Sequence, residues 1–116
     1  MKWRLSLFLS ILFFYGNSAH IIGGEITYRC IEEGKYEITM ILYRDCNGNG
    51  ALFDSTSGSP FPATVTIYEE GEELPRIFEL DAPIIEDISE LNQIPFLKPP
   101  LNSCVEKGTY TFEVEL

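Results

Sequence analysis

The clearest alternation of polar and apolar residues in this chain spans residues 109–116, which read TYTFEVEL. Successive side chains of an extended strand point to opposite sides, so Tyr110, Phe112, Val114 and Leu116 share one face. This pattern predicts a half-buried β-strand.

The same two-residue period recurs in two earlier stretches. Residues 25–30 carry apolar side chains at the even positions, and residues 35–44 repeat the pattern. The segment Glu32-Glu33-Gly34 between them contains a glycine, as tight turns often do. We therefore expect these two half-buried strands to form an antiparallel hairpin.

Shorter strands are expected in the middle of the chain. Residues 63–69 and 76–80 read as two strands separated by the charged turn 70–73. Several prolines exclude central-strand pairing over much of 81–103, where 86–91 can hold a short strand or a helical turn. Five or six short strands with turns about every ten residues predict an all-β fold, an Ig-like antiparallel β-sandwich.

The N-terminus has the composition of an export signal. Lys2 and Arg4 precede an apolar run at 5–15, and small residues follow at 16–19. The run is shorter than the roughly 20 residues of a membrane-spanning helix. We expect a cleaved signal peptide at 1–19, the alternative being a buried core helix.

The remaining residues, 20–116, suffice for a single β-sandwich-like domain. The chain stops at Leu116, inside the last expected strand. We therefore expect the domain to be truncated from a longer polypeptide.

The chain is strongly acidic, with a formal net charge of −10 and an isoelectric point near 4.4. Nucleic acids and anionic membranes attract basic patches, so the charge argues against both as partners. No apolar run long enough to span a membrane follows the N-terminal one.

The three cysteines, Cys30, Cys46 and Cys104, are an odd number for an exported domain. A strand of about nine residues between Cys30 and Cys46 would hold them roughly 30 Å apart, beyond the reach of a disulfide. We favour a Cys46–Cys104 bridge, because both residues lie at loop–strand junctions, and we expect Cys30 to be a buried free thiol. A bridge to another chain and a zinc site are alternatives, although His20 is the sole histidine.

Residues 45–50 read DCNGNG and open like a calcium loop. Asp45, Asn47 and Asn49 offer alternate oxygen ligands before a glycine, and the nearest closing carboxylate is Asp54. That carboxylate comes two residues too early, and no helices flank the loop. These four residues are a candidate calcium set, but the sequence favours a plain Asn/Gly turn with no cofactor.

Two motifs resemble catalytic ones superficially. The segment at 20–24, HIIGG, is similar to the activated N-terminus of trypsin-type proteases, but a single histidine cannot supply their dispersed catalytic set. The carboxylate pairs at 32–33, 69–70 and 72–73 lie in turns and read as solvated edges. The sequence predicts a protein that is not an enzyme.

Three strings of the mature sequence, at 20–30, 36–39 and 42–48, resemble the N-terminal segment of secreted surface proteins of Bacteroidetes. Such proteins are usually labelled gliding-motility-associated or PKD-domain-containing. Residues 53–54, 66–68 and 104–110 extend the likeness over nearly the whole mature chain. In that family this segment precedes β-sandwich repeats and a C-terminal domain for type IX secretion, neither of which this chain contains.

The resemblance implies a non-enzymatic, extracytoplasmic structural or adhesion-type module of a cell-surface or gliding-associated protein. Its partners would be neighbouring domains of a longer surface protein, or extracellular glycan or protein. The alternative is a free-standing small secreted ligand-binding or inhibitor protein.

Overall fold

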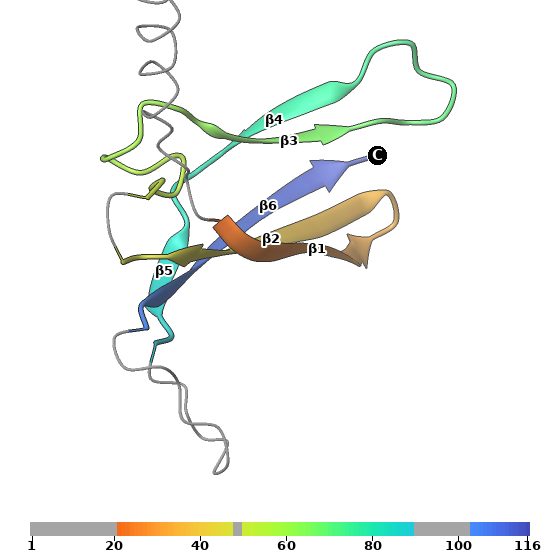
Figure 1. Cartoon of the computed structure of the whole chain (residues 1–116). Coiled ribbons are helices and arrows are strands. Elements are labelled where there is room, and N and C mark those ends of the chain that lie inside the picture. Colours follow the sequence, from red (N-terminus) through yellow and green to blue (C-terminus); the bar gives the residue numbers. More distant parts are fainter. Residues whose placement is uncertain (1–20, 48–49, 90–102) are drawn as a thin grey trace, which may run out of the picture.

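The computed structural model of the chain describes residues 21–47, 50–89 and 103–116. All regular structure within these ranges is β-strand, arranged in two antiparallel sheets (Figure 1). The predicted all-β, sandwich-like fold is confirmed. The signal peptide expected at 1–19 lies outside the described residues.

The larger sheet has four strands in the order β1-β2-β6-β5. They are β1 (Ile21–Glu32), β2 (Lys35–Asp45), β5 (Ile84–Asp87) and β6 (Val105–Glu115). β2 and β6 occupy the centre, and each pairs with its neighbours in antiparallel register. The last strand of the described chain, β6, thus lies between β2 and β5.

The smaller sheet is a hairpin of β3 (Ala63–Ile67) and β4 (Arg76–Leu80). Figure 1 shows it above the four-stranded sheet. The expected strand at 76–80 is confirmed, and the strand expected at 63–69 ends two residues earlier, at Ile67. β5 begins at Ile84 and ends at Asp87, so it overlaps the short strand or helical turn expected at 86–91 only at its first two residues.

The β1–β2 turn forms where the sequence predicts it. Gly34 adopts a positive φ of 74°, a conformation that glycine accepts without steric cost. The carbonyl of Gly34 accepts a hydrogen bond from the backbone N–H of Leu116, 2.8 Å away. The turn is therefore tied to the end of β6.

The register gives the larger sheet one polar and one apolar face. Thr27, Thr39 and Thr111 lie directly opposite one another across β1, β2 and β6. The next row in the same three strands is Ile26, Met40 and Tyr110, which points to the other face. This apolar face is the one that the β3–β4 hairpin covers.

The core lies between the hairpin and the centre of the larger sheet. Its buried side chains are Phe53, Ala63, Leu80 and Tyr110. The rings of Phe78 on β4 and Phe112 on β6 pack with their centroids 5.6 Å apart. The two sheets are thus joined through β4 and β6.

Coverage of the apolar face ends before the first strand. In one row the exposed fraction rises from 1% at Tyr110 on β6 to 61% at Ile26 on β1. In the next, Ile38 on β2 is 9% exposed and Tyr28 on β1 is 76% exposed. The expectation that residues 25–30 are half-buried is wrong, because a two-stranded hairpin is too narrow to cover four strands.

Candidate functional site

The bare part of the apolar face forms a groove beside β3. We call it the β1 groove; its volume is about 320 Å³ and its lining residues are Ile26, Tyr28, Tyr36, Ile38, Ile67 and Leu116. The rings of Tyr28 and Tyr36 meet edge to face, with centroids 6.2 Å apart. The groove is an exposed apolar surface on a floor of paired strands, the kind of patch that marks an interaction site.

The strand that borders the groove has an unpaired edge. In the described part of the chain β3 pairs with β4 alone, and Ile67 at its end lines the groove. β3 reads ATVTI, whereas the three other strands at sheet edges all carry charged residues. Charges on edge strands discourage pairing with another chain, so β3 is the least protected edge of the two sheets.

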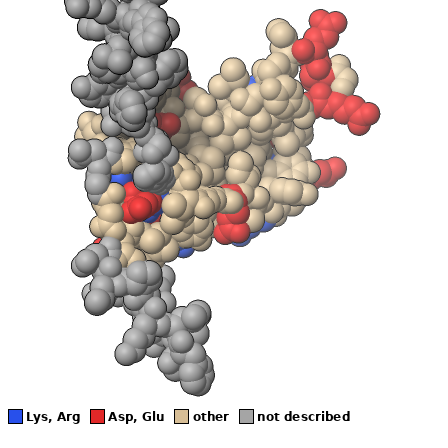
Figure 2. Space-filling model, viewed as in Figure 1, with Lys and Arg blue, Asp and Glu red and all other residues tan. Residues whose placement is uncertain are grey.

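Two acidic connections lie next to the β1 groove. Glu32 ends β1 and Glu33 lies in the β1–β2 turn, and the β3–β4 connection contains four further glutamates at 69–73. Figure 2 shows carboxylates gathered where Figure 1 places the β3–β4 connection. The groove therefore opens between two negatively charged loops.

The described Lys and Arg side chains leave most of these loop glutamates without an ion pair. Every Lys and Arg side chain in the described ranges already forms an ion pair with a glutamate. Among the loop residues only Glu69 takes part, through Arg76 at 2.9 Å. The other loop glutamates have no ion pair with a described cation.

On the polar face, Arg29 and Glu37 lie opposite each other across β1 and β2, with Nε and Oε1 2.6 Å apart. This hydrogen bond and the positive charge lower the pKa of the Glu37 carboxyl, and the same pair raises the pKa of Arg29. This ion pair joins β1 to β2 on the face of the sheet away from the groove.

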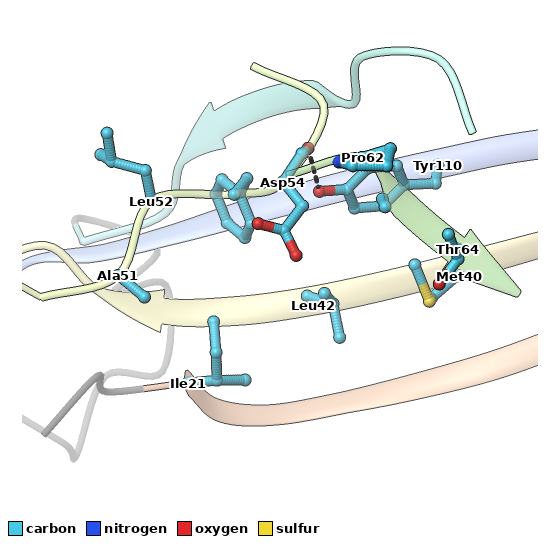
Figure 3. Close-up of a pocket in the computed structure, with 11 residues that line it drawn as sticks. Ile21, Met40, Leu42, Ala51, Leu52, Asp54, Pro62, Thr64 and Tyr110 are labelled. Atoms are coloured by element: carbon cyan, nitrogen blue, oxygen red, sulfur yellow. Dashed lines mark hydrogen bonds between the residues drawn. The ribbon is translucent and has the colours of Figure 1, made fainter. Parts of the chain in front are cut away.

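A second hollow, of about 300 Å³, lies at the other end of β3, beneath the segment at 51–54 (Figure 3). Met40 and Leu42 on β2 form part of its wall, and Tyr110 on β6 lies beside Asp54. The Tyr110 hydroxyl donates to the Asp54 carbonyl at 2.9 Å. Burial, with a smaller contribution from the Asp54 charge, raises the pKa of Tyr110.

Arg44 holds the segment above this hollow in place. Its Nε donates to Glu106 at 2.6 Å, and a terminal nitrogen donates to the carbonyl of Ala51 at 3.0 Å. Its guanidinium also lies 5.6 Å from the ring centroid of Phe53. Phe53 was not predicted as a core residue, because residues 51–54 have no hydrophobic period.

The favoured disulfide is present. Cys46 and Cys104 are bonded, with Cα atoms 5.1 Å apart, at the ends of the neighbouring strands β2 and β6. A structural disulfide is typical of an oxidising environment outside the cytoplasm. Cys30 is free, as expected, but it is exposed, so the expectation that it is buried is wrong for the same reason as for the rest of β1.

The candidate calcium residues are only partly placed. Asp45 Oδ1 accepts the backbone N–H of Asn47 at 2.8 Å, and Asp54 Oδ1 accepts the Ser59 hydroxyl at 2.8 Å. Asn49 lies outside the described residues. Within the described ranges no three His, Cys, Asp or Glu residues gather as a metal site. The first contact has the geometry of an Asx turn, and both the calcium set and the Asn/Gly turn stay predictions.

Comparison with known proteins adds no relative. No protein-family model, curated protein or solved structure matches the chain. In the ranges that the structure describes, no helix has the length and apolar character needed to cross a membrane.

Proposed function

We propose that this chain is a non-enzymatic structural or adhesion-type module of a cell-surface protein, exported and acting outside the cytoplasm. The observation that carries the proposal is the β1 groove. Ile26 and Tyr28 expose large apolar side chains on paired strands, where contact with another molecule would bury them.

Two further features support this role. The Cys46–Cys104 bridge joins the central strands at one end, which stiffens the sheet that carries the groove. The resemblance of the sequence to gliding-associated surface proteins favours neighbouring domains, or extracellular glycan or protein, as partners. The module would act by presenting a rigid surface.

Export is tested by producing the full chain in a bacterium that secretes proteins. We expect peptide mapping of the extracytoplasmic fraction to find the Cys46–Cys104 bridge and a new N-terminus near residue 20. Intact leader in cytosolic material with reduced cysteines would contradict the proposal.

Adhesion is tested with beads that carry the oxidised protein. We expect wild-type beads to be retained on intact cells, and beads carrying Ile26→Asn with Tyr28→Asn to be retained about tenfold less. Ile84→Asn is the matched control, because Ile84 is 71% exposed on β5 at the opposite edge of the sheet. Equal retention of all three proteins would argue against the groove as the contact surface.

The hollow beneath residues 51–54 favours a second candidate, a small secreted ligand-binding protein. Its volume of about 300 Å³ lies at the lower end of ligand pockets. Ala51→Trp would fill the hollow from its rim and leave the β1 groove unchanged. Loss of small-molecule binding with unchanged bead retention would assign function to the hollow.

A further inference from the structure

We propose that the β1 groove receives an extended segment of another protein, which adds a third strand to the β3–β4 sheet and carries basic residues at one end. The inference rests on the proposed contact function and specifies its partner. The segment would lie beside β3 and above Ile26, Tyr28 and Ile38.

The first argument is that an edge with which no described strand pairs lies beside a bare apolar floor. A strand added to β3 would lie about 4.8 Å from it, toward β1. Its backbone would pair with the N–H and C=O groups that β3 directs away from β4. One ligand would therefore satisfy the edge and cover the floor.

The second argument concerns the side-chain pattern of the ligand. Val65 and Ile67 on β3 are partly buried, whereas Thr64 and Thr66 are exposed. An added strand follows the same alternation, so every second side chain would point down onto the groove. Because β3 spans five residues, an occupant of about six residues with alternating apolar and polar side chains fits.

The third argument is charge. The end of β3 at Ile67 leads into the glutamate-rich connection, and Glu32 and Glu33 add charge where β1 ends and its turn begins. The described cations are already paired, so these carboxylates favour Lys or Arg at the adjacent end of the ligand. A second copy of this acidic chain would bring like charges together, which disfavours it as the occupant.

The test uses the oxidised full chain and a synthetic peptide that alternates valine and threonine over about six residues and ends in two arginines. We expect saturable binding by fluorescence anisotropy. Replacing the arginines with glutamates, or methylating the alternate amide nitrogens, should each weaken binding about tenfold. Raising the salt from about 0.05 M to about 0.5 M should weaken it several-fold.

The protein variants locate the peptide. Ile26→Asn and Tyr28→Asn change exposed side chains, so the fold should persist, and each should weaken binding about tenfold. Ile84→Asn should bind as wild type does. Absence of peptide binding, or binding unaffected by amide methylation or by the groove variants, would overturn the inference.

Sedimentation equilibrium tests the competing occupant. A dimer that Ile26→Asn dissociates would assign the groove to a second copy and overturn the inference. If beads carrying the wild-type protein still adhere to cells while the peptide fails to bind, only this inference fails and the proposed contact function stands.

Discussion

The hydroxyl of Tyr110 on β6 donates a hydrogen bond to the carbonyl of Asp54, 2.9 Å away, and thereby ties the long central strand to the connection between β2 and β3. Tyr110 is the most deeply buried large side chain of the described core. The bond joins segments 56 residues apart in sequence. It is one of the contacts that fix the hollow under residues 51–54.

Tyr110→Phe should lower the free energy of unfolding by about 1–2 kcal/mol, because the Asp54 carbonyl loses its donor while the ring stays packed. Urea titration measures the change. Tyr68→Phe is the matched control: Tyr68 is 80% exposed, and we expect a change within about 0.5 kcal/mol. Equal effects of the two substitutions would show that the hydrogen bond contributes nothing.

Tyr110 should also limit stability at high pH. Burial raises its folded-state pKa above the usual value of 10, so its contribution is present below the unfolded pKa and is lost as pH rises through the folded one. Phenolate absorbance should show one tyrosine titrating after the others, together with unfolding. In Tyr110→Phe that late titration step should be missing.

Gly108→Ala should destabilise the core by about 1–3 kcal/mol. A Cβ atom at this position of β6 would lie 2.9 Å from Cε1 of the Phe53 ring, which packs directly over the glycine. Gly23→Ala in β1 should have little effect, since a Cβ there meets nothing within 4 Å. Phe53→Leu combined with Gly108→Ala should cost less than the sum of the two changes.

Removal of the disulfide should lower stability by about 4 kcal/mol on the chain-entropy model, given the 58-residue separation of Cys46 and Cys104. The double substitution to serine is compared with wild type by thermal and urea denaturation. Cys30→Ser, at the exposed free cysteine, serves as the control and should unfold like wild type. A similar loss of stability in Cys30→Ser would show that replacing a cysteine side chain, and not breaking the bridge, lowers the stability.

Acid should destabilise the fold through carboxyls with lowered pKa values. Hydrogen bonds from Ser89 lower the pKa of Asp87, and the hydrogen bond from Arg29 lowers that of Glu37. Both contributions are present above the unfolded pKa values of about 4 and are lost as pH falls through the lower folded values. The melting temperature should therefore decline below about pH 4, less steeply in Glu37→Gln, and identical slopes would contradict this account.

Much of the fold follows from residue alternation. The period of two places Met40 on the apolar face of the strand at 35–44 and Tyr110 on that of the strand at 109–116, and the structure pairs these two residues directly. A Gly-containing turn predicts the β1–β2 hairpin, and loop–strand junctions favour the Cys46–Cys104 bridge. The strands and the turn depend on the residue types of short segments, which can be read from the sequence, and the bridge follows from where the cysteines lie relative to those strands.

What the sequence did not predict depends on the width of the second sheet. Alternation in β1 shows that Ile26 and Tyr28 share a face, but it does not tell whether anything covers them. Only the count of strands in each layer would have indicated a bare strip, since two short strands oppose four. Phe53 escaped prediction because it packs against residues that are far away in sequence, among them Leu80, Gly108 and Tyr110.

The covalent bridge lies at one end of β2 and β6, and the β1 groove lies at the other. Amide protons near Cys46 should therefore exchange with deuterium last, and those near Tyr36 and Ile67 should exchange early. Local opening would begin where an incoming strand is expected to dock. Binding of that strand would then also slow the first step of unfolding. The module would therefore resist mechanical force best while its ligand is bound.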